Sequence, residues 1–293
     1  MDVLSVGSLD EALDAKSRRP EAVPIAGGTD VMVAINGGAA RPDALLDLGR
    51  VRELSGWQRS DHELALGAGL SYTAIQRDLP DERVLVQAAR SVGSPQIRNR
   101  GTVGGNVGTA SPAGDLLPVL AAADAEIELG ADGGRRRSVP WDRFFVGPKR
   151  TALGPDELIL AVRWRRLLGP GVFAKVGPRN AMVISIASIC LLVDEEGRGL
   201  RVALGSVGPT VLRAPEAERF AAEAVAAAGG WGDAAALPAD ADIARFAELA
   251  AEAAAPIDDR RGTAPYRRHA VGVLAERALR WVLADRRAAR DGG

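Results

Sequence analysis

The chain has 293 residues, 47% hydrophobic and 26% charged, with a formal net charge of −1. This length is enough for two or three folding units with their own cores, and the balanced charge gives no electrostatic support for nucleic-acid binding. A single cysteine, Cys190, excludes internal disulfides and cysteine-held iron–sulfur clusters, and two histidines disfavour a protein-held zinc or iron site.

Membrane attachment and export have no support in the sequence either. No apolar run approaches the ~18 residues that a membrane span requires. The first residues, M-D-V-L-S-V-G-S-L, lack a basic segment followed by an apolar one, so we expect no signal peptide and a cytoplasmic protein.

The first fifty residues have a β-α-β pattern. Ser8 or Asp10 is a suitable cap for a short helix over the following residues. Residues 23–26 have the composition of a strand that enters a glycine-rich turn, and the apolar run 30–35 leads away from that turn. Residues 44–48 are predicted to form a buried strand.

The segment from Glu63 onward mixes strands and short helices. The patterns predict strands at 63–68, 125–129 and 157–162, helices beginning near 71, 84 and 115, and a hairpin turn at Asp132-Gly133-Gly134.

A linker at Leu167–Gly171 precedes the last part of the chain. Three strands are expected there, followed by alanine-rich helices within 220–255 and a final helix from about Tyr266. Strands followed by helices predict an α+β arrangement, with helices on one face of an antiparallel sheet. The expected strands cover residues 172–176, 182–193 and 200–207.

Two glycine-rich turns are the most informative motifs. A-G-G-T-D occupies 26–30 and T-V-G-G-N occupies 102–106. Adjacent glycines allow backbone N–H groups to approach a phosphate oxygen without a Cβ in the way. Two such turns indicate a clamp on a ligand with two phosphates, such as a dinucleotide. The G-x-G-x-x-G motif that follows a strand in Rossmann folds and the P-loop motif are both absent from the sequence.

The same residues have plainer interpretations. Gly27-Gly28 alone is equally typical of an ordinary strand-to-loop turn. Asp30 and Asp115 would repel phosphate, so they either hydrogen-bond sugar hydroxyls or adenine, or cap helices. Arg98 and Arg100 flank the second turn and either balance phosphate charge or remain solvated.

Taken together, these motifs resemble one known family, the FAD-binding subunits of the molybdenum hydroxylases. This family includes the medium subunit of carbon monoxide dehydrogenase and the FAD domain of xanthine dehydrogenase. The resemblance spans nearly the whole chain. It is carried by A-G-G-T-D at 26–30, T-V-G-G-N with A-S-P-A-G-D-L-L-P-V-L up to 120, W-D-R-F-F-V-G-P-K-R-T-A-L-G-P-D-E-L-I-L at 141–160, F-A-K-V at 173–176 and D-D-R-R-G-T-A-P-Y-R-R-H-A at 258–270.

The resemblance implies an α+β fold with two domains. Residues 1–168 would form a two-subdomain FAD-binding domain of the vanillyl-alcohol-oxidase (PCMH) type, divided into about 1–55 and 56–168. Residues 169–293 would form the C-terminal domain, a three-stranded antiparallel sheet with helices. FAD would lie extended between the two subdomains, with its diphosphate against both glycine turns.

The resemblance also assigns the cofactor contacts. Asp115 would meet hydroxyl groups, and the positive charge of Lys175 would stabilise the reduced flavin ring; the alternative for Lys175 is a surface lysine on an edge strand. The implied contact residues are Pro24, Ile25, Ala26, Gly27, Gly28, Thr29, Asp30, Val31, Val92, Thr102, Val103, Gly104, Gly105, Asn106, Asp115, Ile159 and Lys175.

Two departures from the family pattern leave the ring environment and the electron acceptor open. Val183 stands where family members often have an acidic residue, and Gly147-Pro148-Lys149 replaces the more usual Gly-Tyr-Arg. Neither glycine turn contains histidine, cysteine or tyrosine, so we expect noncovalent FAD.

The expected activity is electron transfer. By resemblance, a large partner subunit holds the molybdenum cofactor, a small one holds two [2Fe–2S] clusters, and this chain passes electrons through FAD to an external acceptor in a dimer of heterotrimers. The chain itself needs no catalytic acid or base and no metal ligand. His62 is expected at a surface turn, His269 in a structural or solvated position, and Cys190 packed in a strand.

Two other functions are compatible with the residues. A self-sufficient flavin oxidase or reductase would need an acid or base over the flavin, for which Arg179, Ser185 and His269 are weak candidates. A flavin-free scaffold would have lost the cofactor, which the intact glycine turns argue against.

Overall fold

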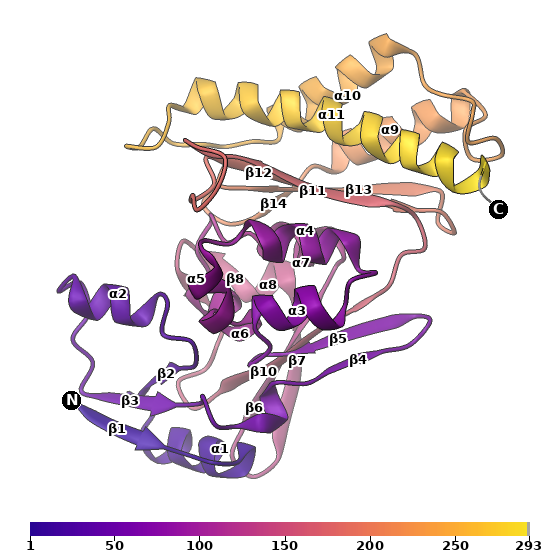
Figure 1. The fold of residues 1–293 in the computed structure, drawn as a ribbon. Coiled ribbons are helices and arrows are strands. Elements are labelled where there is room, and N and C mark those ends of the chain that lie inside the picture. The colour runs from indigo at the N-terminus through magenta and orange to yellow at the C-terminus, as the bar shows by residue number, and fades with distance from the viewer. Residues whose placement is uncertain (292–293) are drawn as a thin grey trace. The chain divides into compact units, whose positions relative to one another are not determined.

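The computed structural model describes residues 1–291, which form two compact units that are discontinuous in sequence. The first unit contains residues 1–80, 92–111 and 124–165. The second contains 81–91, 112–123 and the chain from 166 onward. Figure 1 shows the elements of both units.

A small parallel sheet begins the first unit. Its strands are β1 (Asp2–Ser5), β2 (Val23–Ile25) and β3 (Ala44–Asp47), in the order β1-β3-β2. The helix α1 (Leu9–Arg18) connects β1 to β2, and the Ser8 side chain caps it by accepting a hydrogen bond from the Glu11 amide at 3.2 Å. The β-α-β pattern predicted for this segment is therefore present, with α2 (Val31–Asn36) inserted before β3.

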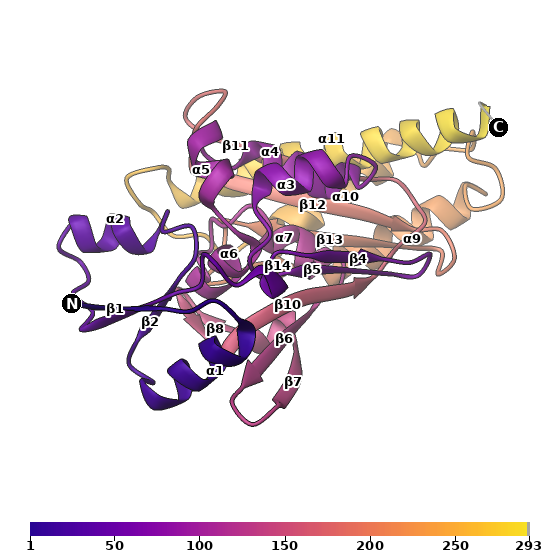
Figure 2. The ribbon, with the colours of Figure 1, turned by 60° about the horizontal axis from the view of Figure 1, so that its bottom comes forward.

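A five-stranded antiparallel sheet forms the rest of the first unit's framework, in the order β4-β5-β10-β6-β7. Leu64 and Leu66 alternate into its core and are fully buried. The turn between β6 and β7 has Gly133 and Gly134 at φ 72° and 74°, as the hairpin prediction required. Figure 2 shows this sheet. The strands are β4 (Trp57–Arg59), β5 (Glu63–Gly67), β6 (Glu126–Ala131), β7 (Arg135–Pro140) and β10 (Leu158–Arg165).

Short helices and a hairpin complete this unit. They are η1 (Arg52–Leu54), α3 (Tyr72–Asp78), α5 (Pro95–Arg100), α6 (Val103–Thr109) and α8 (Trp141–Phe144), with the hairpin strands β8 (Phe145–Gly147) and β9 (Arg150–Thr151).

The second glycine-rich segment is a helix, where the sequence indicated a turn. Thr102 caps α6 because its Oγ1 accepts a hydrogen bond from the Gly105 amide at 3.0 Å. Val103 and Val107 are fully buried beneath the helix. This capping and packing compensate for the low helix propensity of the glycines.

The second unit is built on an antiparallel sheet with strands β11 (Gly171–Val176), β12 (Ala187–Asp194), β13 (Gly199–Gly205) and the short β14 (Leu212–Arg213). The last strand adds a fourth to the three expected. The strand predicted from residue 182 begins only at Ala187. Met182 has a φ of 52°, which an extended strand does not allow, and the Arg179 side chain donates to the carbonyls of Ala181 and Met182.

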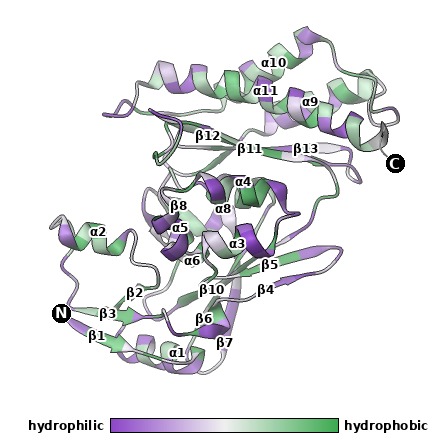
Figure 3. Ribbon diagram, in the orientation of Figure 1, coloured by the Kyte–Doolittle hydropathy of each residue, from purple (hydrophilic) through white to green (hydrophobic). Residues whose placement is uncertain are grey.

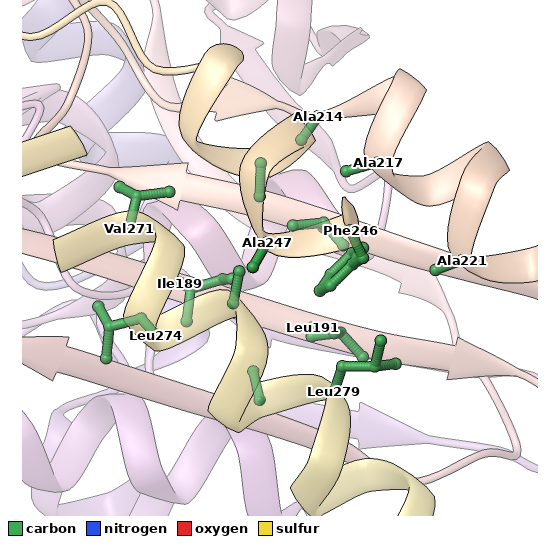
Figure 4. Packing of buried hydrophobic residues seen from close by; sticks show 14 of the residues in the cluster. Ile189, Leu191, Ala214, Ala217, Ala221, Phe246, Ala247, Val271, Leu274 and Leu279 are labelled. Atoms are coloured by element: carbon green, nitrogen blue, oxygen red, sulfur yellow. The ribbon is translucent and has the colours of Figure 1, made fainter. Parts of the chain in front are cut away.

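Helices pack on this sheet. The alanine-rich region forms α9 (Pro215–Ala227) and α10 (Asp240–Glu252), and the chain ends in α11 (Ala264–Asp291). Figure 4 shows Ile189 and Leu191 of β12 packed with Phe246 of α10 and with Leu274 and Leu279 of α11. Burying each large side chain contributes roughly 1.5–3 kcal/mol. Cys190 lies between Ile189 and Leu191 in β12 and is also fully buried. The helices α4 (Arg83–Ser91) and α7 (Leu117–Ala122) contact the sheet as well.

The side chain of Arg267 connects loops of the second unit through one set of polar contacts. Arg267 is 4% exposed and donates to the carbonyls of Ile186 and Ser206 at 2.9 and 2.7 Å. It also pairs with Asp259 at 2.6 Å. The 258–270 motif that carries part of the family resemblance therefore has a structural role here.

Candidate functional site

The first unit contains a cavity of about 280 Å³. Both glycine-rich segments contribute to its wall, together with the ends of β2 and β10. The lining residues are Val23–Val31, Leu48, Leu54, Ala68, Gly69, Tyr72, Gly101, Thr102, Gly104, Gly105, Asn106, Gly108, Thr109, Leu153, Leu158 and Ile159.

The first glycine-rich segment packs against the backbone that leads directly into the second. A Cβ added to Gly27 would lie 1.8 Å from the carbonyl oxygen of Arg100, which precedes the second segment. No side chain fits in this space, so only glycine permits the approach. The structure thus brings together two motifs that are about seventy residues apart in sequence.

The first segment offers free hydrogen-bond donors. Among the described residues, none accepts a hydrogen bond from the backbone amides of Gly27 to Val31. Gly28 has a φ of 73°, a conformation that L side chains rarely adopt. These consecutive N–H groups precede or begin α2 and line the cavity, so they form an electropositive surface suited to an anion.

The second segment uses its amides internally. The Val103 and Gly104 amides donate to Leu70 and Ala68 at 3.0 and 2.7 Å, and the Gly105 amide donates to Thr102 Oγ1. The donors therefore come from the first segment. The side-chain amide oxygen of Asn106 is buried and has no hydrogen-bond partner among the described residues.

The face of α6 that contains Gly105 and Gly108 has no side chains at these two positions to fill the cavity. An added Cβ at Gly105 meets only Thr102 Oγ1, at 3.1 Å, and one at Gly108 meets only Ile159, at 3.4 Å. All these residues line the cavity, so side chains at the two glycines would take up space inside it. This leaves room for an extended ligand along the helix.

Asp30 is the one charged residue among those described as lining the cavity. It is exposed, and its side chain makes no capping bond to α2. Asp30 therefore stands at the N-cap position of α2, but only its backbone takes part in the helix. Its carboxylate is available to accept hydrogen bonds from ligand hydroxyl or amino groups.

The remaining predicted contact residues are placed elsewhere. Val103 is fully buried beneath α6 and Val92 does not line the cavity. Ile159 lies in its wall. Arg98 donates to the carbonyls of Val92 and Gly93, so its side chain is engaged within the protein.

Asp115 and Lys175 belong to the second unit, where they form an ion pair at 2.6 Å. The Lys175 ammonium also donates to the carbonyls of Ser91 and Val183, at 2.8 and 3.1 Å. Asp115 accepts from the hydroxyls of Ser91 and Ser185, at 3.0 and 2.7 Å. Lys175 is therefore part of a buried polar network, its charge is compensated, and its three donors are occupied.

The candidate groups for direct substrate oxidation have other roles or positions. Arg179 binds nearby carbonyls, and Ser185 is bonded to Asp115. His62 and His269 are exposed. Burial raises the pKa of the Cys190 thiol, so this cysteine stays protonated and unreactive.

The described residues also contain no metal-binding group of three or more His, Cys, Asp or Glu side chains. Within residues 1–291, no helix is long and apolar enough to cross a membrane.

Several wall residues were not predicted. Gly108 follows Gly104 and Gly105 at helical spacing, so recognising α6 as a helix would have identified it. Leu48, Leu54, Tyr72 and Leu153 reach the wall through tertiary contacts that no local pattern reveals.

The fold and the cavity define a nucleotide-binding α+β protein. A cavity whose wall has free amides in one segment and a helix with exposed glycines in another suits a dinucleotide with a diphosphate bridge. Comparison with known proteins specifies the class further. Residues 1–164 match the FAD-binding domain in molybdopterin dehydrogenase, and residues 173–282 match the C-terminal domain of the CO dehydrogenase flavoprotein.

Individual relatives agree. The carbon monoxide dehydrogenase medium chain of Hydrogenophaga pseudoflava is 30% identical over 271 residues, covering 87% of each chain. The xanthine dehydrogenase FAD-binding subunit of Escherichia coli O157:H7 is 31% identical over 228 residues, covering 74% of this chain and 77% of its own. A solved carbon monoxide dehydrogenase structure from H. pseudoflava matches with a TM-score of 0.83 and 26% identity, covering 97% of both chains.

The chain therefore belongs to the family of FAD-binding medium subunits of the molybdenum hydroxylases, and it is a flavoprotein subunit of an oxidoreductase complex. Its cofactor is FAD.

Proposed function

We propose that this chain is the electron-transfer subunit of a three-subunit molybdenum hydroxylase. It receives electrons from [2Fe–2S] clusters in a small partner subunit and passes them to an external acceptor. A large partner subunit oxidises the substrate at its molybdenum cofactor. The assembly is a dimer of heterotrimers in the cytoplasm.

The free amides of Gly27 to Val31 are the observation that carries the site assignment. Backbone N–H groups in this arrangement bind phosphate oxygens without a net protein charge. The contact between Gly27 and Arg100 keeps this donor segment against the second glycine-rich segment. We therefore assign the FAD diphosphate to the first segment and noncovalent contacts along α6 to the second.

When bound, FAD supplies a carrier that links one-electron donors to a two-electron acceptor. The residues of this chain bind and orient it. The cavity wall at Pro24–Val31, Thr102, Gly104–Asn106 and Ile159 supports direct contact. The contacts of Val92, Val103, Asp115 and Lys175 rest on the family resemblance alone. In this function no side chain of this chain transfers a proton to or from the substrate.

Co-purification tests this function. The chain is expressed with its candidate large and small partner subunits, and the complex is analysed for flavin, iron and molybdenum. We expect one FAD for each copy of this chain and flavin reduction by substrate only in the complex. Reduction of the flavin in the isolated chain by an organic substrate would favour a self-sufficient oxidase instead.

A further inference from the structure

Two neighbouring loops of the second unit expose large apolar side chains to solvent. Met182 and Ile184 lie in the loop between β11 and β12. Ile257 lies in the loop between α10 and α11, and Tyr266 lies in the first turn of α11. These four side chains are 46–73% exposed, and Figures 1 and 2 show both loops at the same end of the unit. Clustered apolar exposure of this kind marks an interaction site.

Contacts between the two loops fix their backbones. The guanidinium of the buried Arg267 donates to the carbonyl of Ile186 in one loop and pairs with Asp259 in the other. Gly262 lies close to both, because a Cβ added there would be 3.2 Å from Ile186 Cγ2 and 3.6 Å from Tyr266 Cδ1. The exposed side chains are therefore presented on a backbone that is already held in place, which lowers the entropy cost of binding a partner.

The charge around these side chains is positive. Residues 176–186 and 257–269 contain five arginines and two aspartates, a net charge of +3 with histidine neutral, although the whole chain has −1. Arg260 and Arg268 are exposed and form no ion pair with other described residues. Both aspartates already accept hydrogen bonds from groups within the second of these segments. The loops therefore form an apolar surface with a cationic rim.

We propose that this surface docks the [2Fe–2S] subunit of the complex, through a region of that subunit with an apolar centre and a carboxylate rim. The charge of the rim favours this occupant, because a [2Fe–2S] cluster held by four thiolates carries negative charge that complements the arginines. The docking surface, defined by its apolar and unpaired cationic side chains, consists of Met182, Ile184, Ile257, Arg260, Tyr266 and Arg268. This inference rests on the proposed function.

The test measures the binding kinetics of the separately expressed [2Fe–2S] subunit, with its clusters, on the full-length chain loaded with FAD. Ile257→Ser with Tyr266→Ser removes two apolar anchors and should raise Kd about 10- to 100-fold, mainly through faster dissociation. Arg260→Glu with Arg268→Glu should slow association about tenfold at low salt, and the difference should shrink at high salt because exposed charges are screened.

Matched controls lie elsewhere on the second unit. Leu237→Ser removes a side chain that is 48% exposed, and Arg277→Glu reverses an exposed charge three turns along α11 from Tyr266. Both controls should bind like the wild type. All variants should keep the flavin content and melting temperature of the wild type, because the changed side chains are on the surface.

The outcomes separate this inference from the proposed function. Wild-type kinetics in both double variants would overturn the docking surface. So would unchanged [2Fe–2S]-subunit binding accompanied by a loss of binding to the molybdenum subunit or of self-association, because another occupant would then cover the surface. If the wild-type chain binds neither partner subunit and co-purifies with neither, the proposed function itself fails.

Discussion

Gly27→Ala is the most informative single substitution in the cavity wall. Its Cβ would lie 1.8 Å from the Arg100 carbonyl oxygen and 2.4 Å from the carbonyl carbon. Because a carbon–oxygen contact needs about 3.3 Å, the two backbones must separate by roughly 1.5 Å. Neither neighbour is a flexible side-chain end, so the wall itself has to move.

The expected magnitudes follow from this displacement. Overpacking of this kind costs about 1–3 kcal/mol, and each kcal/mol lowers the melting temperature by roughly 2–4 °C in a chain of this size. Displacing the donor segment should also break one or two charge-assisted hydrogen bonds to the diphosphate. This corresponds to a loss of about 10- to 100-fold in FAD affinity.

The assay is the flavin content of the purified protein, followed by titration of the apoprotein with FAD and thermal unfolding. Gly56→Ala is the control, because an added Cβ there meets nothing within 4 Å. The reasoning is refuted if Gly27→Ala matches the wild type in both FAD affinity and melting temperature.

Three further sets of variants test other parts of the molecule. Gly28→Val combined with Gly105→Val forces a side chain into a positive-φ position and another into the cavity, so FAD occupancy should fall; unchanged occupancy would show that the assigned cradle is wrong. Lys175→Met should lower the free energy of unfolding by about 3–5 kcal/mol, because it leaves the carboxylate of Asp115 buried without its cationic partner. Adding Asp115→Asn should recover part of this loss. Equal stability of the single and double variants would argue against a coupled pair. The Arg261 amide, and then Arg267, lower the pKa of Asp259. The contribution of ionised Asp259 to the free energy of unfolding is therefore complete above the unfolded pKa of about 3.9 and is lost as the pH falls through the lower folded pKa. The stability difference between the wild type and Asp259→Asn should therefore shrink in acid. A difference that does not change with pH would contradict the assignment.

The regular elements were largely predictable from local patterns. Alternation identified β5, and the apolar stripe identified α11, whose Val271, Leu274 and Val282 are buried as expected. The exception within the site is α6, where Gly104, Gly105 and Gly108 argue against a helix. It forms because Thr102 caps it and because Val103 and Val107 are buried, and the second condition depends on tertiary packing.

The site was predictable in its chemistry and less so in its geometry. Paired glycines next to Thr and Asn indicated a phosphate cradle, and the structure brings both segments into one wall. The division between free amides in the first segment and engaged amides in the second depends on partners such as Ala68 and Leu70. The ion pair between Asp115 and Lys175 joins residues far apart in sequence, so it could not be foreseen from spacing. Figure 3 shows that α2 is largely hydrophobic, although none of its residues is fully buried.

The structure of this chain determined with bound FAD is the most direct test. The account predicts that diphosphate oxygens lie within hydrogen-bond distance of the backbone amides between Gly27 and Val31. A diphosphate held only by other residues, with those amides facing solvent, would contradict it.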